Sequence, residues 1–179
     1  YLKNTAIVNP HSKITFTDPT GKTFVFERAT DIMPVKSKEI KPHPEGMEIG
    51  EFQKYAQRSA QKTARAFLVN FSRVTSRVAD EILRKANVKG ETKPSALDRD
   101  QCKEIVKAIG TTKIMAPPTD CLSPIGDTLI KKGLMHVLDG MRPDYYAPPV
   151  TRAPKSVNGN PFIIEAGIVY GGDIPSDGP

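Results

Sequence analysis

The sequence has few of the residues that build disulfide-bonded or metal-dependent proteins. Among its 179 residues there is no tryptophan, and there are only two cysteines and three histidines. Two cysteines form neither a disulfide framework nor a four-ligand zinc site, so we expect Cys102 and Cys121 to be buried, reduced thiols. His11, His43 and His136 are far apart in the sequence. We therefore expect no bound metal and no catalytic histidine.

Long apolar runs and phosphate-binding loops are also missing. No run approaches the roughly 18–20 apolar residues that span a bilayer, and the first residues do not form a signal peptide. We therefore expect no membrane partner. The sequence contains neither a Walker A loop nor a GxGxxG motif. Tyr145 and Tyr146 have no basic or metal-binding cluster nearby in the sequence, so we do not predict a nucleophilic tyrosine.

Positive charge, in contrast, is abundant and unevenly distributed. The formal net charge is +6, and residues 51–113 contain 14 Lys and Arg against 7 Asp and Glu, so this region carries the whole excess. A localised basic surface is typical of proteins that bind nucleic acid. A solvated face, or a face that meets an acidic protein partner, remains an alternative.

Residues 1–48 predict the end of a helix, a hairpin and a linker. Apolar stretches at 14–16 and 23–29 flank Asp18-Pro19-Thr20-Gly21, which suits a type I turn. Two strands alone are marginally stable, so the hairpin should complete a larger sheet. Prolines predict an extended linker at 31–48. The apolar strand expected at 162–170 has no partner strand after it, and the chain has no initiator methionine, so we expect an excerpt of a longer protein.

The middle of the chain predicts helices, beginning with a short basic one at 51–61. Thr63 is the expected N-cap of a longer helix, because apolar residues recur after it at helical spacing. These residues are Phe67, Phe71, Val74, Val78 and Ile82. Another face of the same helix would carry Arg73, Arg77, Asp80 and Arg84. Asp80 and the adjacent Glu81 are expected to pair with Arg77, Arg84 and Lys85.

Two further helices have clear start signals. Asp98 and Gln101 have the spacing of a capping box, and Gly110 lies just past the expected helix end. Ser123 is the expected N-cap of the last helix, with a proline at its first position and Gly133 at its end.

Six segments of the sequence, in order, resemble one protein family. They are TAIVNPH at 5–11, FERATD at 26–31, KPHPEG at 41–46, FSRVTSRVADEI at 71–82, PPTDCLSPIG at 117–126 and NPFIIEAGIVYGGDIP at 160–175. Over essentially its whole length the sequence resembles the B subunit of the type IIB DNA topoisomerases, the topoisomerase VI family.

The resemblance implies a fold that is mainly α in the centre, a helix–two-turn–helix domain, flanked by partial α/β pieces. Residues 1–48 would be the last strands of a GHKL-type ATPase domain and its exit linker. Residues 49–142 would form the helix–two-turn–helix domain, and 143–179 a linker and the first strand of a transducer domain.

The resemblance also implies an enzyme that relaxes and decatenates DNA by ATP-gated duplex passage, of which this part alone would be inactive. ATP and Mg²⁺ would bind elsewhere in the whole protein. The partners would be duplex DNA, the topoisomerase VI A subunit and a second B subunit, in a heterotetramer. The location would be cytoplasmic for an archaeal protein or nuclear for a plant one.

Candidate DNA contacts follow from the basic helices. Guanidinium groups on a helix can engage phosphates bidentately, and nothing in their spacing suits the reading of base edges. The candidates are Lys62, Arg65, Arg73 and Arg77. The alternative is a structural spacer or subunit-docking module without direct DNA contact. A stand-alone repair glycosylase is disfavoured, because two cysteines cannot form the four-cysteine zinc finger common in that family.

Overall fold

The computed structural model describes residues 1–138 and 140–175, a mixed α/β structure of two compact units. Unit 1 comprises residues 1–36, 123–152 and 164 onward, and unit 2 comprises residues 37–122 and 153–163. The chain therefore passes from one unit to the other four times.

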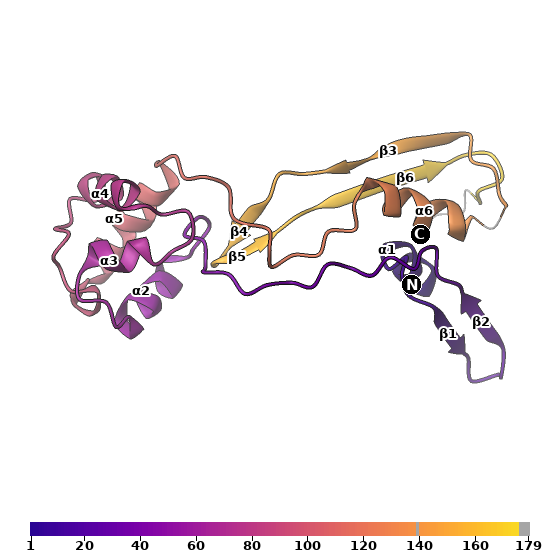
Figure 1. The fold of residues 1–179 in the computed structure, drawn as a ribbon, viewed down its shortest axis with the longest axis horizontal. Coiled ribbons are helices and arrows are strands. Elements are labelled where there is room, and N and C mark those ends of the chain that lie inside the picture. Colours follow the sequence, from indigo (N-terminus) through magenta and orange to yellow (C-terminus); the bar gives the residue numbers. More distant parts are fainter. Residues whose placement is uncertain (139, 176–179) are drawn as a thin grey trace. The chain divides into compact units, whose positions relative to one another are not determined.

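Unit 1 is built around one helix. Its elements are α1 (Leu2–Val8), β1 (Ile14–Thr17), β2 (Thr23–Phe26), α6 (Asp127–Val137), β3 (Tyr145–Thr151) and β6 (Glu165–Tyr170). Helix α6 packs against α1 and against the antiparallel pair of β3 and β6 (Figure 1). Gly133 permits the close approach of α1, since a Cβ atom there would lie 2.4 Å from the carbonyl oxygen of Ile7.

The hairpin of unit 1 confirms its sequence-based prediction. β1 and β2 pair antiparallel, with Ile14 opposite Phe26 and Thr17 opposite Thr23. The N–H of Gly21 donates to the carbonyl of Asp18 at 3.0 Å, which closes the turn. The Asp18 carboxylate also accepts from the backbone of Thr20 at 2.8 Å, as an Asx-turn does.

The expected start and end of the last helix are wrong. Helix α6 begins at Asp127 after Gly126, whose φ is 81°, and it continues through Gly133 to Val137. The Ser123 hydroxyl instead donates to the carbonyl of Val35. The Glu165 carboxylate accepts from the N–H groups of Ile125 and Gly126 at 2.8 Å each, so a distant strand residue orders the segment that precedes the helix.

The expected unpaired strand at 162–170 is also wrong in two respects. It is divided, with Phe162 ending one strand and Glu165 beginning the next. Both pieces have partners upstream in the chain: β6 pairs with β3, and β5 pairs with β4.

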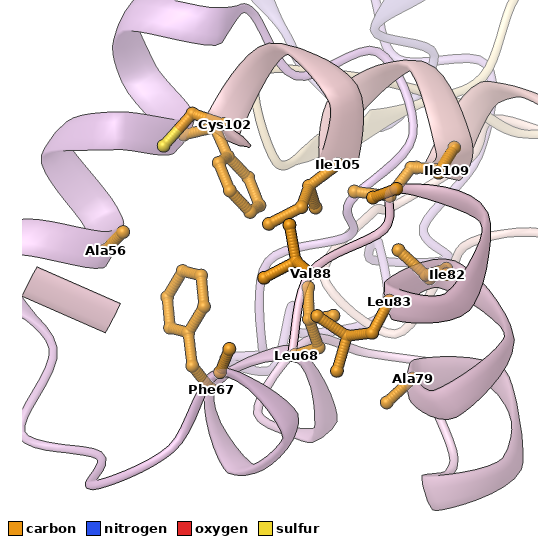
Figure 2. Close-up of a cluster of buried hydrophobic side chains, with 14 of the residues drawn as sticks. Ala56, Phe67, Leu68, Ala79, Ile82, Leu83, Val88, Cys102, Ile105 and Ile109 are labelled. Carbon is orange, nitrogen blue, oxygen red and sulfur yellow. The ribbon is translucent and has the colours of Figure 1, made fainter. Parts of the chain in front are cut away.

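Unit 2 is a small helical domain with one short hairpin. Its elements are α2 (Ile49–Arg58), α3 (Ala64–Val69), α4 (Ser76–Lys85), the 3₁₀ turn η1 (Pro94–Ala96), α5 (Arg99–Gly110), β4 (Lys155–Val157) and β5 (Asn160–Phe162). Side chains from α2 to α5 converge around Val88 in one apolar core (Figure 2). Phe52, Leu68, Ile82 and Ile105 are completely buried. Each such side chain stabilises the fold by about 1.5–3 kcal/mol.

The prediction of one long helix from Thr63 to Ile82 is wrong, although its N-cap is confirmed. The Thr63 hydroxyl accepts from the N–H of Ala66, but α3 ends at Val69. Arg73 then takes a left-handed conformation with φ 62°, and Thr75 caps the separate helix α4. Ser and Thr hydroxyls favour caps over helix interiors, and this preference outweighs the apolar periodicity here.

The other predictions for unit 2 are closer to the structure. The capping box is present: the Asp98 carboxylate accepts from the N–H of Gln101 at 2.7 Å, and the Gln101 side chain accepts from the N–H of Asp98 at 3.1 Å. Gly110 is the last residue of α5 rather than the residue after it. Cys102 is buried as expected, whereas Cys121 is partly exposed. Burial raises the pKa of the Cys102 thiol.

The proline-rich segment expected as a linker is extended, but its end packs into unit 2. The His43 side chain is fully buried. Its backbone N–H donates to the carbonyl of Gly159 at 3.1 Å, and the carbonyl of Pro42 accepts from the N–H of Ser72 at 2.9 Å. Gly46 has φ 72°, and a Cβ atom there would lie 2.2 Å from the carbonyl oxygen of Ser156. This segment therefore holds the β4–β5 hairpin against the helices.

Candidate nucleic-acid interface

All four candidate DNA contacts lie in unit 2, and all four side chains are exposed. Lys62 directly precedes the cap of α3, and Arg65 lies in the first turn of that helix. Arg73 lies in the turn between α3 and α4, and Arg77 lies in the first turn of α4. Helix N-termini favour anions, so the ends of two helices add to the positive potential of these side chains.

Arg65 is not a free cation, because it forms a bidentate ion pair with Asp80 of α4. Its Nε lies 2.6 Å from Oδ1, and its Nη2 lies 2.9 Å from Oδ2. The hydrogen bond from Arg65 is the main reason that the pKa of Asp80 is lowered, and it raises the pKa of Arg65. The expected pairing of Asp80 with Arg77 or Arg84 is therefore wrong. The pair joins α3 to α4, whose separation the sequence did not indicate.

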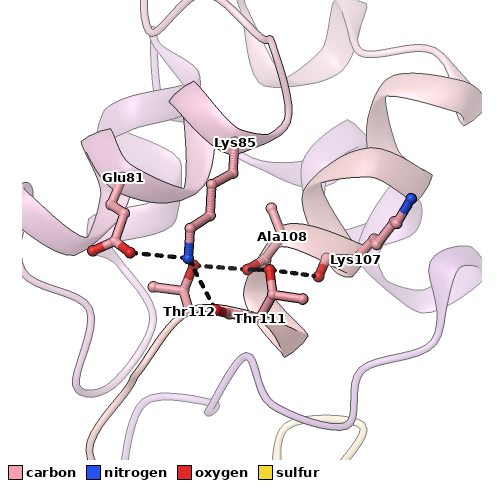
Figure 3. A network of polar contacts seen from close by, with 6 residues as sticks. All are labelled: Glu81, Lys85, Lys107, Ala108, Thr111 and Thr112. Carbon is pink, nitrogen blue, oxygen red and sulfur yellow. Dashed lines mark hydrogen bonds and ion pairs between the residues drawn. The ribbon is translucent and has the colours of Figure 1, made fainter.

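Lys85 is also engaged inside the protein (Figure 3). Its Nζ lies 2.9 Å from Oε1 of Glu81, as expected, and this contact lowers the pKa of Glu81. The same ammonium group donates to the carbonyl of Thr111 at 2.9 Å and to the hydroxyl of Thr112 at 3.0 Å. The Thr112 hydroxyl in turn donates to the carbonyl of Ala108 at 2.7 Å. Lys85 thus satisfies the C-terminal end of α5 and is not available to a ligand.

Three of the four candidates form no ion pair with the described residues. They are Lys62, Arg73 and Arg77. Arg73 is displayed on a turn rather than on a helix face, so the continuous cationic stripe expected from the sequence does not exist. The structure places the candidates on two helix starts and the turn between them. This arrangement suits contact with phosphates by individual side chains rather than by one helix laid along a groove.

A hollow beside α2 is not predicted from the sequence. It is lined by Tyr55 and Arg58 of that helix and by Asn70 at the end of α3. The sequence does contain an indication of it, because Tyr55 lies between Lys54 and Arg58 in the short basic helix, and the structure shows that Tyr55 is exposed. Within the described part of the chain, no group of three His, Cys, Asp or Glu residues could hold a metal ion. No helix of this part is long and apolar enough to cross a membrane.

Comparison with known proteins identifies the family. The family model for the transducer of the topoisomerase VI B subunit matches residues 117–179. The chain is 46% identical over 178 residues to the B subunit of type 2 DNA topoisomerase 6 from Methanococcoides burtonii, covering 99% of this chain and 28% of that protein. It is 43% identical over 179 residues to the corresponding protein from Archaeoglobus fulgidus, covering 99% of this chain and 29% of the relative.

The Methanosarcina mazei protein gives a third match, at 46% identity over 180 residues, covering 99% of this chain and 28% of that protein. The chain therefore spans between a quarter and a third of the length of these relatives. The transducer match begins at residue 117, upstream of the expected start at 143, and it includes α6. This agrees with the packing of α6 on β3 and β6 within unit 1. The chain belongs to the family of topoisomerase VI B subunits.

Proposed function

We propose that this chain links the ATPase and transducer parts of a type IIB topoisomerase B subunit and that its unit 2 contacts duplex DNA. The helices of unit 2 would belong to the helix–two-turn–helix domain, and residues 1–48 would supply the last strands of the ATPase domain and its exit linker. ATP and Mg²⁺ would bind to other parts of the whole protein. The A subunit and a second B subunit would be its protein partners. The names of the relatives, as parts of a type 2 DNA topoisomerase, support this assignment.

The observation that carries the DNA contact is the unneutralised positive charge of unit 2. Lys62, Arg73 and Arg77 are exposed, form no ion pair with the described residues and adjoin the starts of α3 and α4. Lys and Arg side chains that reach phosphates release counterions, which gives affinity without sequence preference. Arg65 would contribute less, because it would have to leave Asp80 first.

The test uses the whole B subunit assembled with its A subunit. In it, Arg73→Ala/Arg77→Ala should slow ATP-dependent relaxation of supercoiled DNA while ATP hydrolysis without DNA stays unchanged. Lys103→Ala/Lys107→Ala is the matched control, since it removes two exposed cations from α5 of the same unit. Equal relaxation by the two double variants would contradict the proposed contact.

A second candidate function is that of a spacer that docks an acidic surface of another subunit without touching DNA. It is favoured by three cations that form ion pairs within unit 2 and are therefore not free to meet phosphates. They are Lys54, Arg65 and Lys85. In that case the Arg73/Arg77 variant would weaken assembly with the A subunit. Duplex binding by the isolated chain would be absent even at low salt.

A further inference from the structure

A hollow of about 480 Å³ opens beside α2 in unit 2, and the proposed duplex contact does not use it. Its walls include Tyr55 and Arg58 of α2, Gln61 of the following loop, and Phe67 and Asn70 of the α3 region. A smaller hollow of about 150 Å³ shares the tyrosine, the phenylalanine and the asparagine. The larger volume lies within the roughly 300–1,000 Å³ range of small-molecule sites.

Tyr55 and Phe67, which line one wall of the hollow, belong to an aromatic cluster. The rings of Phe52, Phe67 and Phe71 are buried and pack together, with centroid distances of 5.3–6.2 Å. The Tyr55 ring lies 6.3 Å from that of Phe71 and is 42% exposed. Tyr55 is therefore the one ring of this cluster that offers a face to a ligand, and the buried ring of Phe71 packs against it.

The remaining walls are polar and carry unused hydrogen-bonding groups. Within the described residues, the side-chain amides of Gln61 and Asn70 make no hydrogen bond, so each offers a donor and an acceptor. Lys54 is bound to Glu51 at 2.6 Å, which neutralises both. Arg58 has no such partner among the described residues and keeps its charge at the rim.

We propose that this hollow binds one unstacked nucleotide of a DNA strand. The base lies against Tyr55, the amides of Asn70 and Gln61 meet its edge, and Arg58 meets a flanking phosphate. Stacking on an aromatic ring with cations along the backbone is how proteins hold single strands. An apolar peptide anchor fits less well, because the exposed apolar residues are only Tyr55 and Ala60, and the polar walls match a base edge and a phosphate.

The inference rests on the proposed function only in taking DNA as the partner. The test measures binding of the full chain to a labelled single strand of about 12 nucleotides with 2-aminopurine at its centre. Fluorescence anisotropy gives the affinity, and 2-aminopurine emission reports whether the base stacks on the protein. A duplex of the same sequence and free dAMP are measured alongside.

The expected result is tight binding of the single strand with a change in 2-aminopurine emission. Tyr55→Leu, which keeps the apolar volume, should weaken this binding about tenfold and abolish the emission change. Tyr55→Phe should behave like the wild type. Neither substitution should alter duplex affinity, and thermal melting checks that both variants fold.

Unchanged single-strand affinity and emission in Tyr55→Leu would overturn the proposal. So would binding of free dAMP as tight as that of the strand, which would make this a site for free nucleotides. Loss of duplex binding in Arg73→Ala/Arg77→Ala with unchanged single-strand binding would support two separate sites. Absence of duplex binding with Tyr55-dependent single-strand binding would overturn the proposed duplex contact and leave this inference standing.

Discussion

At the scale of single residues, His43 is a structural group rather than a catalytic one. Its Nδ1 accepts from the N–H of Glu45 at 3.3 Å, which assigns the proton to Nε2, and Nε2 donates to the carbonyl of Met115 at 3.1 Å. Burial is the main cause of its lowered pKa, and the charge of Arg73 lowers the pKa further. The neutral ring thus joins the proline-rich segment to the loop after α5.

This environment predicts that the protein loses stability in mild acid. The unfolded chain takes up a proton near the ordinary histidine pKa of about 6.5, whereas folded His43 resists it, so its contribution is present above that pH and lost below it. The pKa values of Asp80 and Glu81 are lowered from 3.8 and 4.5, so the contribution of these carboxylates to stability changes only at lower pH. Urea unfolding between pH 7 and pH 5 gives the free energy of unfolding at each pH. This free energy should fall less steeply with decreasing pH in His43→Gln than in the wild type. An equal slope in that variant would refute the role of His43.

The ion pair between Arg65 and Asp80 can be tested by removing the charge of Asp80. Asp80→Asn releases the guanidinium and removes a negative charge, so duplex binding should tighten and the salt dependence should steepen by about one counterion. Asp100→Asn on α5 is the matched control, because Asp100 is exposed and forms no ion pair with the described residues. Titration of labelled duplex at several salt concentrations gives both slopes. Equal slopes for the two variants would mean that Arg65 does not contact phosphate.

At the scale of elements, local signals predict local structure and little more. The Asp98 capping box, the Thr63 cap and the Asp18 turn each depend on residues a few positions apart, and each is present. The break at Arg73 was missed because apolar periodicity continues through it. The start of α6 was missed because it depends on Glu165, which lies some 40 positions downstream.

The close packing of α1 on α6 at Gly133 can be tested by substitution. Alanine stabilises an open helix position relative to glycine by about 1 kcal/mol. Gly133→Ala should nevertheless lower the melting temperature, since its Cβ would lie 2.4 Å from the Ile7 carbonyl oxygen and push α1 from α6. Gly50→Ala in α2 is the control: a Cβ there meets nothing within 4 Å, so this variant should melt at a higher temperature. A stabilised Gly133→Ala would show that α1 is not tightly packed on α6.

At the scale of the whole molecule, the sequence does not reveal which segments of the chain come together to form each unit. Each unit joins distant segments: unit 1 places α1 against α6, and unit 2 adds residues 153–163 to the helices. The six matching segments predicted the family correctly, and the charge count drew attention to the middle of the chain. Neither indicated that Arg65 is paired and Arg73 lies on a turn, since both facts depend on the path of the chain between α3 and α4.

The proposal that unit 2 holds duplex DNA through cations without ion-pair partners among the described residues is tested directly by one measurement. This is the affinity of the chain for a labelled duplex at several salt concentrations, compared between wild type and Arg73→Ala/Arg77→Ala. We predict steep loss of wild-type binding as salt rises, and in the variant weaker binding with a slope shallower by about two counterions. Absent binding at low salt, or an unchanged slope in the variant, would contradict it.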